Sequence, residues 1–274
     1  MKSLLKFNER RPLLFALMLL VAWMILVSFV AILVGYLVDK PVADPLVQAI
    51  GTLVATLLLL FGAYRIGWIN RIGVTSFGST MSWIATFVVA IYVLLVNFYA
   101  YFGEISFQFD SLLNKEAVPI LLQGLRAGIV EEIMFRGLIL YSLVRVWGRK
   151  REGVVFAITV QAVLFALPHV LQLFAGVPPM SALSNVLATL VFGLWTGLLV
   201  VVVGSVWPAI FIHAVSNSFT LIKGLSSAWV TPYYLGYLRA VLFELPLVLI
   251  GLWILLRLNQ KESPEAFSKP IEKA

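Results

Sequence analysis

Residues 12–38 read PLLFALMLLVAWMILVSFVAILVGYLV, a run of 27 residues without a charged side chain. A helix needs about 20 apolar residues to cross a hydrocarbon layer of about 30 Å. The run is too long for the apolar part of a secretory signal peptide, and no convincing small-residue cleavage site accompanies it. It therefore predicts a retained transmembrane helix.

Seven further apolar segments of similar length follow the first one. They cover residues 46–64, 81–103, 117–144, 153–174, 181–203, 205–222 and 233–256. The ten-residue alternation of apolar and polar residues that marks β-barrel strands does not occur in them. Every backbone polar group in lipid needs an internal hydrogen-bond partner. With a β-barrel excluded, α-helices are the structure that meets this need. The sequence predicts an all-α fold, a polytopic membrane bundle of about eight transmembrane helices.

The composition agrees with a membrane protein. The chain is 61% hydrophobic and 12% charged, whereas soluble domains are about 45–50% apolar and about 25% charged. The absence of cysteine excludes a thiol nucleophile, a disulfide framework and a cysteine-ligated metal. The net charge is +7, and the basic residues lie in the loops between the spans. Nucleic-acid binders instead carry their basic residues along a groove or an arm, so no nucleic-acid partner is expected. We expect one transmembrane domain over residues 1–256 and a disordered polar tail over 257–274.

The basic residues predict the orientation of the bundle. With eight spans both termini lie on one side, which holds 14 basic residues, and the other side holds three. The larger set comprises Lys2, Lys6, Arg10, Arg11, Arg65, Arg71, Arg145, Arg149, Lys150, Arg151, Arg257, Lys261, Lys269 and Lys273; the smaller set comprises Lys40, Lys115 and Lys223. The positive-inside rule then places both termini in the cytoplasm. We expect an integral protein of a prokaryotic plasma membrane.

The fourth segment carries two adjacent carboxylates near its middle, Glu131 and Glu132, followed by Arg136. Ionisable residues inside spans are costly and by default indicate function. Glu132 and Arg136 stand four residues apart on one helix face and can form an ion pair. Glu131 is rotated by about 100° from Glu132 on a helix. One carboxylate therefore looks structural and the other looks available for chemistry.

Both histidines of the chain also lie in predicted spans. His169 follows Phe165 by four residues late in the fifth segment, and His213 precedes Asn217 by four residues in the seventh. A glutamate, two histidines and an asparagine can together activate a water and stabilise an oxyanion. Each residue also has a structural interpretation: Glu132 and Arg136 as a strut, a histidine as a packing residue, and Asn217 as a hydrogen-bonding contact between helices.

Other buried charges and motifs carry less information. Arg126, Arg239 and Glu244 lie in or near spans, and a mutual charge pair is the expected role. The His-Glu-x-x-His motif of zinc peptidases and the glycine-rich phosphate loop are absent.

Three motifs resemble those of the CAAX protease and bacteriocin-processing family, the Abi or type II CAAX prenyl endopeptidase group of intramembrane proteases. They are Glu131-Glu132-x-x-x-Arg136, Phe165-x-x-x-His169 and His213-x-x-x-Asn217, and the resemblance covers roughly residues 117–222. It implies an eight-helix bundle with a cavity open to the membrane or the cytoplasmic side. It also implies that Glu131 activates water with help from His169.

The resemblance further assigns His213 and Asn217 to an oxyanion hole and Glu132 and Arg136 to structural support. Family members have been regarded both as metal-free glutamate proteases and as metalloproteases. The expectation here is no cofactor; in the alternative, Glu131, His169 and His213 would bind zinc. The expected substrate is a membrane-associated peptide or protein within the lipid bilayer. The competing interpretations are a proton-coupled transporter and a non-catalytic scaffold or immunity-type protein.

Overall fold

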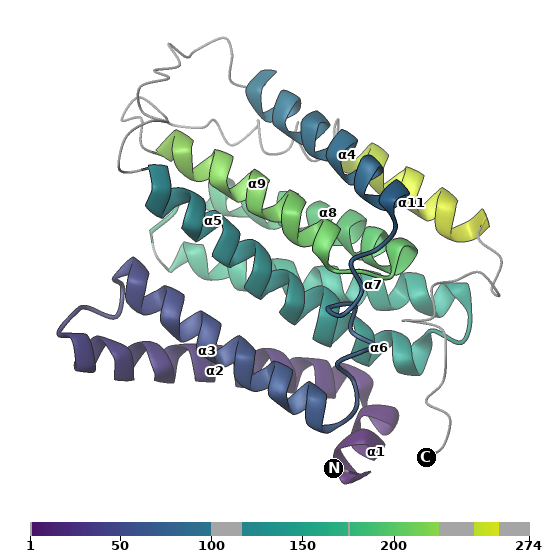
Figure 1. The fold of residues 1–274 in the computed structure, drawn as a ribbon, viewed down its shortest axis with the longest axis horizontal. Helices are drawn as coiled ribbons and strands as arrows, with labels where there is room; N and C mark the ends of the chain where they lie inside the picture. The colour runs from purple at the N-terminus through teal and green to yellow at the C-terminus, as the bar shows by residue number, and fades with distance from the viewer. Residues whose placement is uncertain (1, 100–116, 175, 225–243, 258–274) are drawn as a thin grey trace.

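A computed structural model describes residues 2–99, 117–174, 176–224 and 244–257, and every regular element in these ranges is a helix (Figure 1). The all-α prediction is therefore confirmed for the described residues. In chain order the elements are α1 (Lys2–Arg10), α2 (Pro12–Val38), α3 (Pro45–Arg65), α4 (Thr80–Tyr99), α5 (Ala117–Glu132), the π-helix η2 (Ile133–Ile139), α6 (Leu140–Trp147), α7 (Arg151–Ala166), the 3-10 helix η3 (Leu167–Leu173), α8 (Pro179–Val203), α9 (Trp207–Gly224) and α11 (Leu245–Arg257).

Each of the eight predicted segments contains a helix, but the count of eight spans is not confirmed. Four helical stretches are long and apolar enough to cross a membrane: Pro12–Val38, Pro45–Arg65, Arg151–Leu173 and Pro179–Val203. Two shorter apolar helices, Thr80–Leu95 and Leu245–Arg257, add to them. The ends of the third and eighth predicted segments, residues 100–103 and 233–243, and the tail from residue 258 lie outside the described residues.

The N-terminal helix α1 was not predicted, because it is not apolar enough to cross a membrane. Lys2, Lys6 and Arg10 are exposed on it, whereas Asn8 is buried. The Asn8 amide donates to the carbonyl of Ser142 over 3.1 Å. Its oxygen accepts a hydrogen bond from Arg145 over 3.0 Å. One polar side chain thus fixes α1 to the end of α6.

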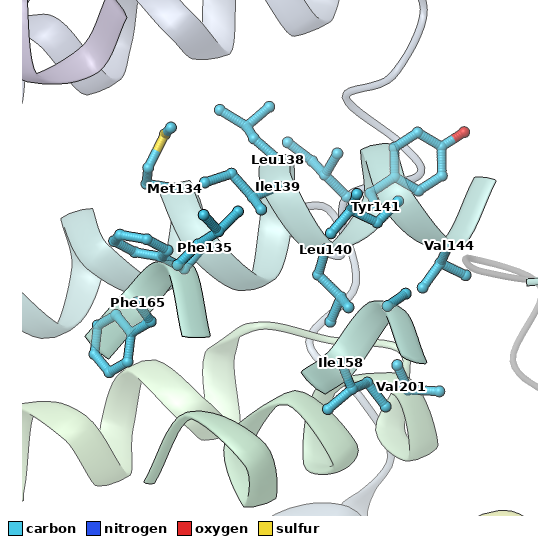
Figure 2. Close-up of a cluster of buried hydrophobic side chains, with 14 of the residues drawn as sticks. Met134, Phe135, Leu138, Ile139, Leu140, Tyr141, Val144, Ile158, Phe165 and Val201 are labelled. Atoms are coloured by element: carbon cyan, nitrogen blue, oxygen red, sulfur yellow. The ribbon is translucent and has the colours of Figure 1, made fainter. Parts of the chain in front are cut away.

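The centre of the bundle is formed by η2 and α6. Every residue from Ile133 to Val144 is buried, including Met134, Leu140 and Leu143 at 0% exposure. Most of these residues are apolar, and neighbouring helices cover them on all sides. Figure 2 shows seven of these side chains in one cluster with Ile158 and Phe165 of α7 and Val201 of α8; they are Met134, Phe135, Leu138, Ile139, Leu140, Tyr141 and Val144.

Turns at one end of the bundle hold the helices together. Gly204 ends α8 in the left-handed conformation, with φ of 70°, which glycine adopts without steric cost. The loop between α3 and α4 meets this turn: Val206 donates to the carbonyl of Gly73 over 3.2 Å, and the Trp207 indole to that of Val74 over 3.0 Å. At the same turn the chain enters α9, which carries part of the candidate site.

Candidate active site

The two adjacent glutamates stand at the end of α5, directly before the π-helix. Glu132 and Arg136 are both fully buried, and Arg136 Nη1 approaches Glu132 Oε1 to 3.0 Å. The predicted ion pair is therefore present. π-helical turns are rare and often occur at functional sites.

Arg136 is held by further contacts that the sequence did not reveal. Its Nε and Nη2 donate to the hydroxyl of Thr196 over 3.1 and 2.6 Å. The guanidinium carbon lies 4.0 Å from the ring centre of Phe165, a cation–π distance. Thr196 in turn donates to the carbonyl of Phe192 over 2.6 Å. The arginine is thereby fixed between η2, α7 and α8.

His213 of α9 links the two glutamates. Its Nδ1 lies 2.7 Å from Glu132 Oε1, a hydrogen-bond distance, and its Nε2 lies 3.9 Å from Glu131 Oε2. The side chain of His213 is 6% exposed and that of Glu131 is 31% exposed. Glu132 therefore orients the imidazole, and the other ring nitrogen faces the more accessible carboxylate.

His169 lies in η3, where Pro168 follows the end of α7. It is within electrostatic range of Glu131 and of His213. The ring of Phe165 stands 6.0 Å from the rings of both histidines, measured between centres. The backbone of Phe165 and Ala166 interacts with the His169 ring. Even so, the buried Nδ1 has no partner in hydrogen-bond geometry among the described residues.

Asn217 is placed by helix register. It stands one turn after His213 on the same face of α9 and is partly exposed. Its side chain makes no hydrogen bond with the described residues. The structure thus places His213 next to both glutamates and His169 within electrostatic range of Glu131 and His213, and it leaves Asn217 one helical turn from His213.

Two glycines allow the helices that carry the site to approach closely, and Figure 1 shows α5 and α9 side by side. A methyl group on Gly128 would lie 2.8 Å from the Ala214 nitrogen and 2.9 Å from the Ile210 oxygen. A methyl group on Gly124 would overlap Ser218. Small residues at such positions let helix backbones come together in membranes. This contact sets the separation between Glu131 and His213.

Replacing Gly128 by alanine is expected to destabilise the protein and to lower any activity that depends on the α5–α9 separation. The added methyl group meets backbone atoms, so the helices must move apart, at a cost of about 1–3 kcal/mol. Thermal unfolding in detergent measures the effect. Gly62→Ala is the matched control, because a methyl group there meets nothing within 4 Å. Equal melting temperatures for the two variants would contradict the argument.

A separate cavity of about 520 Å³ lies between α4, α5 and α9. Its walls are almost entirely apolar and include Trp83, Leu125, Ile129 and Phe211. The four candidate residues Glu131, His169, His213 and Asn217 do not line it. The cavity instead follows the face of α9 that carries Phe211 and Ala214, adjacent to the face that carries His213.

The zinc alternative requires Glu131, His169 and His213 to converge on one point. Three ligands are needed for a catalytic zinc site, at about 2 Å from the metal. No group of three histidine, aspartate or glutamate residues within the described ranges is arranged to hold a metal ion. Nδ1 of His213 contacts Glu132, and Nε2 lies 3.9 Å from Glu131 Oε2.

A comparison with protein families identifies the central region of the chain. Residues 113–219 match the family model described as Type II CAAX prenyl endopeptidase Rce1-like. No curated protein and no solved structure matches the chain. The matched region contains the adjacent glutamates, both histidines and Asn217, so the resemblance inferred from the three motifs is confirmed. Residues 113–219 are therefore similar to the type II CAAX prenyl endopeptidase Rce1-like family, a family of proteases.

Proposed function

We propose that this chain is an intramembrane endopeptidase that hydrolyses a peptide bond of a membrane-associated peptide or protein without a metal. The observation that carries the proposal is the position of His213. One of its ring nitrogens is 2.7 Å from the buried Glu132 carboxylate, and the other is 3.9 Å from the accessible Glu131 carboxylate. Two carboxylates with unequal burial around one imidazole suit separate roles in acid–base chemistry.

Glu131 is the general base of the proposed reaction. Its carboxylate is partly exposed, so a water can reach it, whereas Glu132 is fully buried and paired. Glu131 takes a proton from the attacking water and later delivers a proton to the leaving amine. His169 assists, because a second imidazole within electrostatic range of Glu131 can orient the same water.

His213 and Asn217 stabilise the oxyanion of the tetrahedral intermediate. Glu132, ionised beside Arg136, accepts the Nδ1 proton of His213. In the proposed step both ring nitrogens of His213 carry a proton, Nδ1 toward Glu132 and Nε2 toward the oxyanion. The Nε2–H group donates to the oxyanion together with the Asn217 amide, as preorganised donors do in acyl transfer. Glu132 and Arg136 orient the ring and do not touch the substrate.

Cleavage of a membrane-tethered peptide tests the proposal. The purified protein in liposomes is expected to hydrolyse a farnesylated peptide ending in Cys-Val-Ile-Met, or its unprenylated lipid-anchored counterpart, with product release followed by mass spectrometry. Activity is expected to survive treatment with a zinc chelator, because in the proposed step Glu131 activates the water without a metal. Loss of activity in chelator and its recovery with added zinc would contradict the metal-free mechanism. If neither peptide is cleaved, the endopeptidase assignment is wrong.

A further inference from the structure

Thr196 of α8 is a buried residue that the proposed mechanism does not use. Its side chain has 0% exposure. The hydroxyl accepts hydrogen bonds from Arg136 Nε over 3.1 Å and from Arg136 Nη2 over 2.6 Å, and it donates to the carbonyl of Phe192 over 2.6 Å. A hydroxyl has two acceptor lone pairs and one proton. All three are used here, so the direction of the hydroxyl is fixed.

The two hydrogen bonds to Thr196 engage the Nε–Nη2 edge of the Arg136 guanidinium. Such an edge can form two parallel hydrogen bonds with a carboxylate. With this edge on Thr196, the ion-pair contact with Glu132 is made by Nη1, 3.0 Å from Oε1. Buried Nη1 has no partner in hydrogen-bond geometry among the described residues. Thr196 thus keeps the guanidinium beside the carboxylate but not aligned with it.

Glu132 uses a single oxygen for both of its contacts. Oε1 meets Nη1 of Arg136 and lies 2.7 Å from Nδ1 of His213. The other oxygen, Oε2, is buried and has no hydrogen-bond partner in the part of the chain that the structure describes. A guanidinium released from Thr196 would be able to engage both oxygens at once, which is the stronger arrangement. That pair would turn Oε1 away from the imidazole.

The same region of α8 also contacts His213. Phe192 precedes Thr196 by one helical turn, and its ring centre lies 5.0 Å from the ring centre of His213 and 5.8 Å from Cζ of Arg136. This aromatic ring restricts sideways movement of the imidazole but offers Nδ1 no acceptor oxygen. The rotation of the imidazole about its own axis therefore depends on Glu132 and, through Arg136, on the hydroxyl of Thr196.

We propose that Thr196 is a positioning residue of the reaction: by holding Arg136, it keeps Glu132 on Nδ1 of His213 and so directs Nε2 toward the oxyanion. This inference rests on the proposed function, because it takes Nε2 as an oxyanion donor. Thr196 itself contacts neither the substrate nor the reacting atoms. Valine has nearly the shape of threonine without the hydroxyl, and serine keeps the hydroxyl without the methyl group. These two substitutions separate the hydrogen bonds of Thr196 from its packing.

Proton NMR of the protein with isotope-labelled histidine, purified in detergent, reports the contact of Glu132 with His213 without requiring turnover. The chain has two histidines, and His213→Gln identifies the signal of His213. In the wild type and in Thr196→Ser, the proton on Nδ1 is expected to resonate far downfield, because it lies in a charge-assisted hydrogen bond to a carboxylate. Thr196→Val is expected to lose this resonance.

Thr86→Val is the matched control for Thr196→Val. Thr86 is also buried, with 1% exposure, and its hydroxyl donates to the carbonyl of Ser82, four residues earlier, over 2.6 Å. None of its hydrogen bonds to described residues involves an arginine. The variant removes a buried threonine hydroxyl of the same kind from α4, so it should keep both the downfield resonance and the wild-type activity.

Cleavage of the membrane-tethered peptide, measured per folded protein, gives the second readout. Thr196→Val is expected to lower kcat by about 10–100-fold, because a misdirected oxyanion donor is lost from the transition state. KM should stay near the wild-type value, since that interaction is made in the transition state and not with the bound substrate. Thr196→Ser should restore kcat.

Several outcomes would overturn the assignment. One is a Thr196→Val variant that melts at a lower temperature but keeps both the resonance and kcat, because Thr196 would then serve stability alone. Another is a wild type without the downfield resonance, and a third is a folded Thr196→Ser variant that loses both readouts. If Thr196→Val does not fold, Thr196→Cys replaces it, since a thiol is a weaker acceptor of similar size. The same losses are expected there, and their absence would also overturn the assignment.

Failure of this inference is distinguishable from failure of the proposed function, because the resonance does not depend on cleavage. A wild type that cleaves the peptide, with Thr196→Val unchanged in both readouts, overturns the role of Thr196 alone. The opposite case is a wild type that cleaves neither peptide, while Thr196→Val loses the resonance and Thr196→Ser keeps it. That result overturns the endopeptidase and retains the positioning of His213 by Thr196.

Discussion

The Glu131→Gln variant is expected to fold like the wild type and to lose cleavage by about 10²–10⁴-fold, the usual contribution of a general base. The amide has nearly the same shape as the carboxylate but cannot accept the proton of the attacking water. The side chain is partly exposed, and its nearest ionisable partner, His213 Nε2, is 3.9 Å away. Its loss should therefore change the free energy of unfolding by about 1 kcal/mol or less. The measurement is cleavage of the membrane-tethered peptide alongside a thermal melt.

Glu152→Gln is the matched control for Glu131→Gln. Glu152 is an exposed glutamate in the first turn of α7, and no role in the site is assigned to it. Its variant should cleave at the wild-type rate. Glu131→Asp should be intermediate, because it keeps the carboxylate and draws it back by one methylene group. Retained cleavage in Glu131→Gln would remove this residue from the mechanism.

Replacing Arg136 by methionine is expected to destabilise the protein by about 3–5 kcal/mol, since it leaves the buried Glu132 charge without its cation. Both side chains have 0% exposure, so water cannot compensate. The same change removes two hydrogen bonds to Thr196 and the contact with the Phe165 ring. The melting temperature of the purified protein in detergent measures this loss of stability.

The double variant Glu132→Gln, Arg136→Met separates the buried charge from lost packing. Removing both charges leaves no unpaired ion, so the double variant should be more stable than Arg136→Met alone. Lys40→Met is the matched control, because it breaks the 3.0 Å ion pair with Asp44, whose lysine is 45% exposed. That change should cost about 1 kcal/mol or less. If the double variant is less stable than Arg136→Met, then lost packing, and not the unpaired charge, accounts for most of the destabilisation.

The apolar pattern predicted the positions of the helices well, but it did not predict how many of them are long and apolar enough to cross a membrane. Runs such as residues 12–38 exceed the length that a bilayer requires, so composition alone identifies them. His213 and Asn217 lower the mean hydropathy of α9, and charged residues lower that of α5. Neither helix is among the four long apolar helices. Helix α1 was not predicted, because its charged residues interrupt any long apolar run.

Local spacing predicted the contacts made within one helix and none of those made between helices. The pair of Glu132 with Arg136 follows from a separation of four residues, and it is present at 3.0 Å. The contact of Glu132 with His213 joins residues 81 positions apart. Nothing in the intervening sequence gives the rotation or the depth of α9 against α5. The glycines at 124 and 128 were the available signal, since small residues four apart allow close packing.

By itself, the sequence determined that this protein is helical and membrane-embedded, and that its ionisable residues concentrate in three segments. It also determined the ion pair of Glu132 with Arg136, because helix geometry fixes neighbours within one turn. Only the tertiary structure decided that Glu132 also contacts His213 and that Arg126 donates to the hydroxyl of Thr52. The physical reason is that the helices' relative rotation and depth arise from side-chain packing along their whole lengths, which no local pattern specifies.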